Sequence, residues 1–558
     1  MKAVPGDFLL NDIISKIESS ELLIPRFQRA FVWTKEQTAS LLDSIFHNYP
    51  IGSFIIWKTK ERLKSMREIG SVVIPNPPDS DYVYYVLDGQ QRITSLYVSV
   101  KGCAVDLGNG TTEDYSSITV DLTAEDDDRI VYATPDAEVL NPDSSISLSS
   151  LVSSDILPLV EKYGAYIKKI DDYRKLLNGQ YRFSKIDLED ATINVATEVF
   201  TRLNTSGKAL SVFEIMCAKM YDESRDFDLL SKREEQVEEW KASGYDTLPD
   251  TTVLQAVCAC INKTISGKDI LALNKDKFID EWPKVSVAFN AAIDYIKNAY
   301  GAVVSKLLPY DVLIVPFVYY FRFHPTNPSG EAQEYLQDYF WRCVIGSRFG
   351  EGMVSKVSQD IDNVIVPILN NLKPVYDKGI DLSFDTIKLI GGFSTSSAFA
   401  KGVLCILASK NPRSFKTDLK VTIDNAWLAQ GNSKNYHHFF PKKYMEKAHP
   451  SIPSAQVNHV ANITIVDSHL NKNEIRAKAP YIYMNTFAKE NNNIEETMQT
   501  HLISYNEKDE FGIMSDDYEK FFEKRIKRIQ KELKNKIIFN PKLDVIDQDD
   551  TIPTEGIN

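Results

Sequence analysis

The sequence predicts an α+β protein of several domains, with a mixed strand-and-helix N-terminal part, a central helical region and a C-terminal part of a different character. A chain of 558 residues, 43% apolar and 25% charged, has the composition of a globular protein and exceeds the length that one hydrophobic core supports. Strand and helix patterns alternate in its first part, whereas residues from about 216 to 425 carry mainly helical patterns. Six of the eight histidines then lie between positions 437 and 501, which marks the third part.

We therefore expect four segments along the chain. Residues 1–215 form the first domain, 216–425 a helical connector, and 426–540 the histidine-bearing domain with its flanking helices. The last segment, 541–558, is acidic and contains a proline, so we expect it to be mobile.

Local signals define the elements of the first domain. The segment 22–29 is expected to be extended, because it contains an Ile-Pro pair and the residue before a proline avoids helical dihedrals. Thr34-Lys35-Glu36-Gln37 has the pattern of a capping box that opens a helix. The runs 51–57 and 82–87 are rich in β-branched and aromatic residues and are expected strands, and 93–100 is an expected helix.

A polar pentad, Asp88-Gly89-Gln90-Gln91-Arg92, lies between the second of these strands and the helix. Backbone N–H groups at a helix start, a glycine that permits close approach, amide side chains and a fixed positive charge together suit a phosphorylated ligand. A purely structural turn is the competing interpretation, since the sequence has no GxxxxGK[ST] phosphate-binding loop.

Further helix signals flank the central region. Ser211-Val212-Phe213-Glu214 is a second capping box and heads a helix through Met220, and a last amphipathic helix, rich in Lys and Arg, is expected over 517–536. Arg342 and Arg348 of the central region are expected to be packing residues.

The third part carries a chemical signal in the adjacent pair His437-His438. Neighbouring side chains on an extended segment point to opposite sides, so one ring can bind a metal while the other faces water. A phosphodiester is hydrolysed when a divalent cation binds the phosphate and a histidine takes the proton from the attacking water. Asn471 can add a neutral oxygen ligand that suits Mg²⁺ or Mn²⁺.

Three motifs follow one another within about 60 residues: His437-His438-Phe439-Phe440-Pro441, Ala461-Asn462-Ile463-Thr464-Ile465-Val466 and Leu470-Asn471. In this order they resemble the ββα-metal HNH nucleases, and most closely the HNH domain at the C-terminal end of GmrSD-type modification-dependent restriction enzymes. The resemblance implies that His437 is a metal ligand and His438 the general base. It also implies that Asn462 braces the loop that holds the base and that Asn471 is the second ligand. His469 is a rival second ligand, and many relatives have an acid at the position of His437.

Charge and the remaining histidines complete the expectations for this part. The net charge of −13 excludes a protein that coats nucleic acid over its whole surface, but residues 432–490 carry eight Lys and Arg against four Asp and Glu. From this basic island we expect DNA contacts by Lys442, Lys443, Lys472, Arg476 and Lys478. His449 and His501 are expected at the surface, and His459 is expected to pack locally.

The N-terminal motifs resemble the first domain of the same GmrSD-type proteins, a ParB/sulfiredoxin-like fold that binds and usually hydrolyses a nucleoside triphosphate. These motifs are Ile24-Pro25-Arg26-Phe27-Gln28-Arg29, Trp33, the pentad and Phe200-Thr201-Arg202-Leu203-Asn204-Thr205-Ser206-Gly207. The resemblance covers roughly the first 220 residues. It implies a nucleotide-binding set made of Gln28, Arg29, Asp88, Gly89, Gln90, Gln91, Arg92, Arg202, Asn204 and Gly207.

Together the resemblances imply a nucleotide-regulated, metal-dependent DNA endonuclease of anti-phage defence that cleaves modified DNA, a type IV restriction activity. The expected cofactors are Mg²⁺ or Mn²⁺ and ATP or GTP, and the expected partner is modified phage DNA. Two alternatives stay open: a nucleotide-sensing regulator whose HNH fold binds DNA without cutting it, and a toxin that acts on RNA with the same residues. With no signal core and no apolar run of bilayer length, we expect a cytoplasmic protein without membrane contact. The sequence leaves the oligomeric state open, a homodimer included.

Overall fold

The computed structural model describes residues 1–25, 31–63, 65, 68–69, 72–75, 82–106, 112–125, 128–134, 140–203, 211–425, 436–467 and 469–547, without the side chains of residues 68, 194, 197, 201, 436 and 472. Its contacts divide the chain into two compact units, the N-terminal unit Met1–Leu229 and the C-terminal unit Leu230–Asn558. This division falls after the boundary that we expected at residue 215. Residues 230–425 of the expected connector share the second unit with the histidine-bearing segment.

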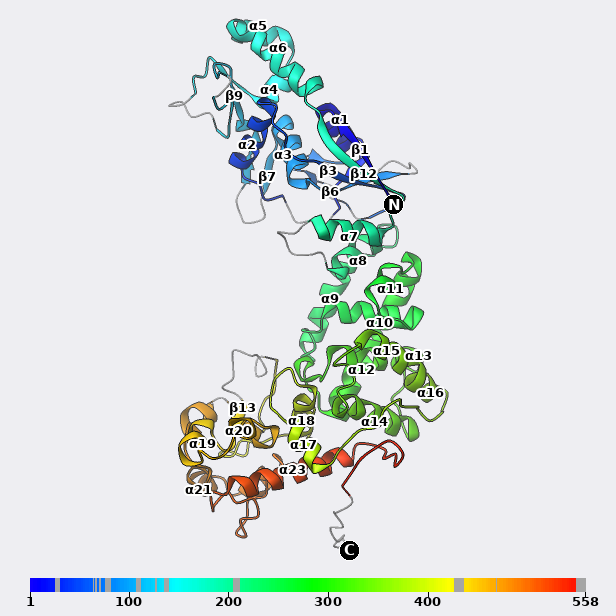
Figure 1. Cartoon of the computed structure of the whole chain (residues 1–558), viewed down its shortest axis with the longest axis vertical. Helices are drawn as coiled ribbons and strands as arrows, with labels where there is room; N and C mark the ends of the chain where they lie inside the picture. The colour runs from blue at the N-terminus through cyan, green and yellow to red at the C-terminus, as the bar shows by residue number, and fades with distance from the viewer. Residues whose placement is uncertain are drawn as a thin grey trace. The chain divides into compact units, whose positions relative to one another are not determined.

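A mixed five-stranded sheet forms the centre of the N-terminal unit (Figure 1). Its strand order is β1-β12-β3-β6-β2, with bounds Lys2–Phe8, Phe183–Glu189, Phe54–Thr59, Val83–Asp88 and Leu22–Leu23. The pairs β1·β12 and β3·β6 are antiparallel, whereas β12·β3 and β2·β6 are parallel. The two strands expected from the sequence, β3 and β6, are thus neighbours near the middle of the sheet.

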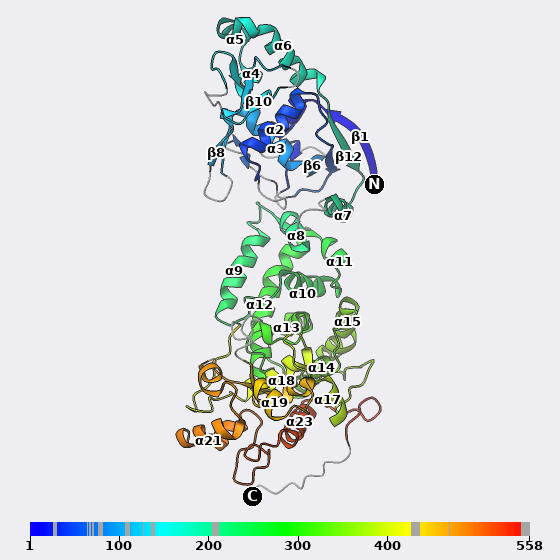
Figure 2. The ribbon, with the colours of Figure 1, turned by 60° about the vertical axis from the view of Figure 1, so that its left-hand side comes forward.

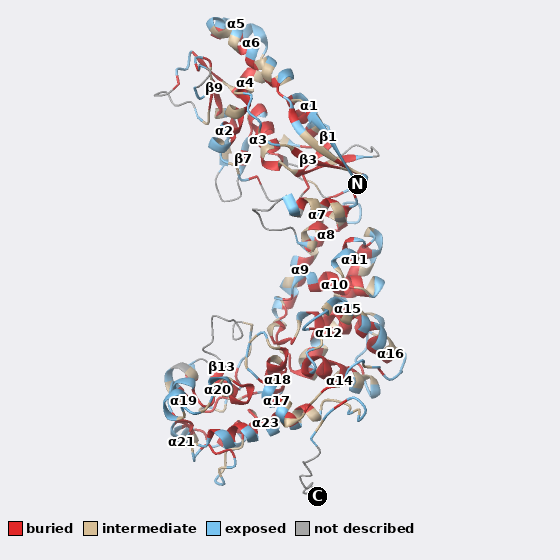
Figure 3. Cartoon of the chain, viewed as in Figure 1, coloured by how far each residue is buried: buried red, intermediate tan, exposed pale blue. Residues whose placement is uncertain are grey.

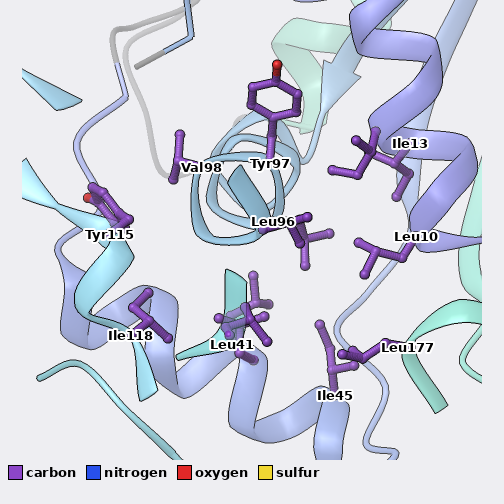
Figure 4. Close-up of a cluster of buried hydrophobic side chains, with 14 of the residues drawn as sticks. Leu10, Ile13, Leu41, Ile45, Leu96, Tyr97, Val98, Tyr115, Ile118 and Leu177 are labelled. Carbon is purple, nitrogen blue, oxygen red and sulfur yellow. The ribbon is translucent and has the colours of Figure 1, made fainter. Parts of the chain in front are cut away.

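Three helices pack together beside this sheet: α1 (Leu10–Glu18), α2 (Lys35–Phe46) and α3 (Gln90–Lys101). The predicted capping box of α2 is confirmed, since Thr34 Oγ1 accepts from Gln37 N at 3.3 Å. Leu10 of α1, Ile45 of α2 and Leu96 of α3 meet in the hydrophobic core of this unit (Figure 4). Helix α3 packs into this core and begins at Gln90, directly after the pentad's glycine.

The rest of the N-terminal unit consists of small sheets and helices. The three-stranded sheet has the order β10-β9-β11 (Val131–Tyr132, Thr119–Asp121, Ser145–Ser147), and the two-stranded sheets are β4·β5 (Glu68–Ile69, Val72–Val73) and β7·β8 (Ala104–Asp106, Thr112–Asp114). The helices are α4 (Leu148–Ser153), α5 (Ile156–Tyr163), α6 (Ile167–Lys175), α7 (Ile193–Leu203) and α8 (Val212–Met220). The predicted second capping box is confirmed at the start of α8, where Ser211 Oγ accepts from Glu214 N at 3.2 Å.

Helices dominate the C-terminal unit, as expected, and pack through their buried faces (Figures 2 and 3). They are α9 (Leu229–Lys241), α10 (Asp250–Asn262), α11 (Gly267–Leu271), α12 (Lys275–Tyr300), α13 (Ile314–Phe323), α14 (Glu331–Ile345), α15 (Met353–Asp360), α16 (Val366–Leu369), α17 (Phe384–Ile390) and α18 (Ala398–Ser409). Within the described part of the chain, no helix combines the length and the apolar character that crossing a bilayer requires.

Two short strands and a helical segment follow α18. Strands β13 (Tyr436–His438) and β14 (Ile463–Ile465) pair antiparallel, and a π-helical segment, η9 (Leu470–Ile475), comes next. The remaining helices are α19 (Lys442–Ala448), α20 (Ser454–Val457), α21 (Pro480–Glu490), α22 (Ile494–Gln499) and α23 (Tyr518–Lys534). Helix α23 confirms the last predicted helix, and its Phe521 stacks on Phe439 with ring centroids 4.9 Å apart.

The chain after α23 packs against the helical part of the same unit. Asp544 is fully buried and accepts two hydrogen bonds from Arg342, at 2.9 and 2.7 Å. A side chain at Gly379 would meet the carbonyl oxygen of Leu543 at 1.6 Å, so the close approach of this segment requires glycine. Residues 541–547 of the tail that we expected to be mobile are therefore held in place, and residues 548–558 lie outside the described residues.

Candidate functional site

Strand β13 places both histidines of the His-His pair at one pocket of about 380 Å³. His437 pairs with Thr464 and His438 with Ile463 across the two-stranded sheet. The pocket is lined by Phe393, His437, His438, Pro441, Lys442, Lys443, Asn458, Asn471 and Arg476. Six residues that the sequence selected for chemistry or DNA contact therefore meet at this pocket. They are His437 and His438 on β13, Lys442 and Lys443 on α19, Asn471 on η9, and Arg476, which follows η9.

His437 is buried in an aromatic surround. Its side chain lies near the rings of Phe415, Phe439 and Tyr483, with centroid distances of 6.0, 6.3 and 5.9 Å. Burial, with a smaller contribution from the neighbouring His438, lowers the pKa of His437 to about 3. The imidazole is therefore neutral at physiological pH, which is the form that binds metal ions.

His437 and Asn471 form the donor pair on which a cation could be held. His437 Nδ1 lies 3.2 Å from Asn471 Oδ1, and both residues border the pocket. One imidazole nitrogen and one amide oxygen suit a hard divalent cation whose other positions are filled by water and phosphate oxygens. Ligation through Nδ1 would place the ring hydrogen on His437 Nε2, which is buried without a hydrogen-bond partner among the described residues.

His469, the rival ligand, lies apart from this pair. Its side chain is 73% exposed and its Nδ1 lies 3.9 Å from Glu474 Oε1. The geometry therefore favours Asn471 over His469 as the second donor. In the described ranges, no group of three or more His, Cys, Asp and Glu side chains could hold a metal ion by itself.

His438 is held through its Nε2 atom, which lies 3.1 Å from Asn458 Oδ1. Burial lowers its pKa to about 4, and the positive charge of Lys442 acts in the same direction. A neutral imidazole at physiological pH can accept a proton, which the role of general base requires. Asn458 was not selected from the sequence; its only signal was its place just before the second motif.

Asn462 connects the two strands from a fully buried position. Its Oδ1 accepts from Phe440 N at 2.8 Å, and its Nδ2 donates to Phe440 O at 3.0 Å and to Val457 O at 2.9 Å. These bonds hold the chain just after His438.

Positive charges surround the pocket. Lys442 and Lys443 occupy the first turn of α19, and all three basic residues at the pocket, Arg476 included, are exposed. Arg476 has a φ of +53°, a conformation that costs a non-glycine residue of order 1–3 kcal/mol. Lys478 is exposed next to it, and the side chain of Lys472 lies outside the described residues.

The other histidines of this part have structural roles. His501 is fully buried rather than at the surface as we expected, because its Nε2 donates to the carbonyl of Arg413 at 2.7 Å and its ring packs on Phe415. His459 is buried and its Nδ1 accepts from Ala461 N at 3.0 Å, which confirms local packing. His449 pairs with Asp516 at 3.1 Å.

In the N-terminal unit the pentad spans the predicted strand-to-helix turn, since Asp88 ends β6, Gly89 is the turn residue and Gln90 begins α3. Gly89 has a φ of +92°, and a Cβ there would meet Phe54 Cδ1 at 2.4 Å, so only glycine fits. Gln90 and Gln91 are buried, and Gln91 Oε1 accepts from Val32 N at 3.0 Å.

Arg92 points into the unit and joins separate segments of it. Its guanidinium donates to Ile51 O at 2.6 Å, to Ser53 O at 3.1 Å and to Asp88 Oδ2 at 3.0 Å. The side chain is 17% exposed, against 36% for Asp88. Arg92 therefore stabilises the turn, and Asp88 is the more accessible partner.

The remaining members of the expected nucleotide-binding set are distributed differently. Arg202, on α7, pairs with Glu198 at 2.6 Å and is 77% exposed. Gln28, Arg29, Asn204 and Gly207 lie outside the described residues. In the central region, Arg348 pairs with Asp360 at 2.7 Å and with Asp377 at 2.8 Å, which agrees with the packing role expected for it and for Arg342.

Comparison with known sequences adds information on both units. Residues 10–221 match the sequence model of the GmrSD restriction endonuclease N-terminal domain. An uncharacterized protein of Methanocaldococcus jannaschii is 24% identical over 517 residues, covering 85% of this chain and 86% of that protein. The chain is thus similar to GmrSD restriction endonucleases over most of its N-terminal unit, and to the archaeal protein across both units.

Proposed function

We propose that this protein is a metal-dependent DNA endonuclease of the modification-dependent restriction type, in which the pocket at β13 cuts DNA and the N-terminal unit binds a regulatory nucleoside triphosphate. The similarity of residues 10–221 to a restriction endonuclease domain supports the restriction role. The single observation that carries the cutting chemistry is the arrangement of His437, His438 and Asn471 around one pocket with a basic rim.

Each residue of the pocket has a chemical task in this proposal. His438, neutral because of its burial, takes the proton from a water that attacks the phosphorus. Lys442, Lys443 and Arg476 bind the phosphates on either side through charge attraction. A divalent cation at His437 Nδ1 and Asn471 Oδ1 would supply charge stabilisation to the phosphate and its leaving oxygen.

The proposal is tested on the purified full-length chain with four DNA substrates: unmodified, hydroxymethylated, glucosylated and phosphorothioated. Each is incubated with and without Mg²⁺ or Mn²⁺, and with and without ATP or GTP. We expect cleavage of at least one modified DNA, its loss in EDTA and its return on addition of either metal. Binding of DNA without cleavage in every arm would instead support a non-cleaving regulator, and cleavage of RNA alone would support a toxin.

The nucleotide part of the proposal has a separate test on Asp88. Asp88→Asn removes one charge but keeps an oxygen that can accept from Arg92, whereas Asp385→Asn makes the same change at an exposed carboxyl of α17. We expect Asp88→Asn to weaken ATP or GTP binding in calorimetry by about tenfold or more, in line with ~1.5–3 kcal/mol for a hydrogen bond to a charged group. Equal affinities in the two variants would return the pentad to a purely structural role.

A further inference from the structure

The loop between α17 and α18 reaches the candidate nuclease pocket from the helical part of the C-terminal unit. Phe393 N donates to Asn458 O at 2.8 Å, and Val460 N donates to Gly391 O at 2.8 Å. Phe393 itself lines the pocket. A segment far from β13 in the sequence is thus hydrogen-bonded to the chain that precedes β14.

Asn458 connects this loop to His438 with its side chain. Its Nδ2 donates to Phe393 O at 3.1 Å, and its Oδ1 lies 3.1 Å from His438 Nε2. Because the carbonyl of Phe393 can only accept, it fixes which end of the amide faces the imidazole. The oxygen faces His438, so Nε2 carries the hydrogen and the lone pair of the neutral ring is on Nδ1.

We propose that Asn458 is a positioning residue that holds His438 in the Nε2–H tautomer, and that the Gly391–Phe393 loop of the helical region is therefore part of the nuclease active site. This inference rests on the proposed function of His438 as general base. A base must present its lone pair to the water in a fixed orientation, and a third group that holds the ring supplies that orientation. Asn462 acts at a different place, since it braces the backbone of Phe440.

The hydrogen bond between Asn458 and Phe393 joins the nuclease pocket to the helical part of the C-terminal unit. The histidine-bearing segment does not contain the acceptor that orients Asn458, because Phe393 belongs to the loop before α18. Any movement of that loop changes the hydrogen bond that holds Asn458 and hence the ring of His438. The helical region can therefore influence the cutting step through a single side chain.

The test compares three variants of the full-length protein. Asn458→Leu keeps the shape of the side chain and removes both hydrogen bonds, whereas Asn458→Asp keeps the acceptor for His438 Nε2–H. Asn491→Leu is the control, because Asn491 also donates a side-chain hydrogen bond to a backbone carbonyl, that of Phe415, at 3.0 Å, and is more deeply buried than Asn458. All three are compared for thermal unfolding before use.

The first readout is the tautomer of His438, measured from the ¹⁵N shifts of histidine-labelled protein and assigned by the signal missing in His438→Ala. We expect a single Nε2–H form in the wild type, in Asn458→Asp and in Asn491→Leu, and exchange between the two tautomers in Asn458→Leu. An unchanged single form in Asn458→Leu would overturn the inference. This readout needs no cleavage, so it holds even if the wild type does not cut DNA.

The second readout is cleavage of the modified DNA that the wild type cuts. We expect Asn458→Leu to lower turnover at saturating DNA by roughly 10²-fold while the Kd for DNA stays unchanged, as for a displaced catalytic group. Asn458→Asp keeps the acceptor for His438 but loses the donor to Phe393 O, so it should recover only part of this loss. An equal loss in Asn491→Leu, or a loss confined to DNA affinity, would show that Asn458 does not position the base.

Discussion

The two polar motifs that the sequence singled out have opposite environments in the folded chain. In the pentad of the N-terminal unit, the side chains of Arg92 and Gln91 are bonded to the backbone of neighbouring segments. At the pocket of the C-terminal unit, the imidazole rings of His437 and His438 form hydrogen bonds with the side chains of Asn471 and Asn458, respectively. The same kind of signal, polar residues at the end of a strand, therefore marks a turn in which Arg92 and Gln91 complete backbone hydrogen bonds in one unit, and a pocket bordered by two imidazole rings in the other.

The two motifs differ in whether nearby backbone groups need their side chains as hydrogen-bond partners. The pentad ends a central strand of the sheet, where the carbonyls of Ile51 and Ser53 need donors, and Arg92 supplies them. The short pair β13·β14 satisfies its own backbone through strand pairing and through Asn462. Its histidine rings are therefore not needed to complete the fold.

The largest expected effect is that of His438→Ala on cleavage. Removal of a general base lowers the rate by ~10²–10⁴-fold, and folding should be retained because the ring is not part of the strand pairing. The matched control is His449→Ala, at a histidine of the same segment that pairs with Asp516. Rates of modified-DNA cleavage measure the effect. A comparable loss of cleavage rate in both variants, or full activity in His438→Ala, would show that His438 is not the catalytic base. The pocket would then no longer be distinguished from the pentad by its chemistry.

Next in size is the effect of Arg92→Ala on the stability of the N-terminal unit. The change leaves the carbonyls of Ile51 and Ser53 and the carboxylate of Asp88 without their donor, which we expect to cost roughly 2–4 kcal/mol. Arg202→Ala is the control, because its ion pair with Glu198 is exposed and should contribute less than about 0.5 kcal/mol.

Urea unfolding, followed by hydrogen exchange in peptides of the N-terminal unit, measures both values. If Arg92→Ala left stability unchanged and abolished nucleotide binding instead, the pentad would be a ligand site of the same kind as the nuclease pocket.

Much of the fold was predictable because its signals are local. Both capping boxes, at Thr34 and Ser211, the strands β3 and β6 and the last helix depend on neighbouring residues only. Each of them is found where the sequence placed it.

Contacts between distant segments were not predictable. The acidic composition of the tail gave no sign that Asp544 meets Arg342 across about 200 residues of sequence. Likewise, Asn458 acquires a role at the candidate site only because Phe393 lies beside it. The roles of Asp88 and Arg92 could not be separated either, since both are polar residues of one motif and only their exposure distinguishes them.

The two units also differ in their expected response to acid. Burial lowers the pKa of His459 to about 4 and of His501 to about 3, whereas an unfolded histidine titrates near 6.5. Between these values the unfolded chain binds more protons than the folded one, so stability rises with pH. The contribution is complete above about pH 6.5 and is lost as the pH falls toward 4, with a slope of up to about 1.4 kcal/mol per pH unit for each histidine.

Hydrogen exchange at pH 7 and pH 5 should therefore show loss of protection in the C-terminal unit that exceeds the loss in the N-terminal unit, whose only histidine is His47. His501→Gln removes the titrating group and keeps a donor for the Arg413 carbonyl, so its stability should vary less with pH. His324→Gln is the control, because His324, the residue that follows α13, is less buried than His501. An identical pH dependence in wild type and His501→Gln would show that another group causes the acid sensitivity.

The smallest expected effect concerns the rim of the pocket and asks whether its charges face DNA. Lys443 is exposed at the start of α19, and its loss should remove one phosphate contact without touching the histidines. For Lys443→Ala we expect the slope of log K against log salt for DNA binding to fall by about 0.9, with equal effect on modified and unmodified DNA. Lys232→Ala, which removes a lysine paired with Glu235 on α9, should leave the slope unchanged. Fluorescence anisotropy at several salt concentrations gives both slopes. Equal slopes for Lys443→Ala and the wild type would place DNA elsewhere on the molecule, and the pocket would then lose the electrostatic feature that distinguishes it from the pentad.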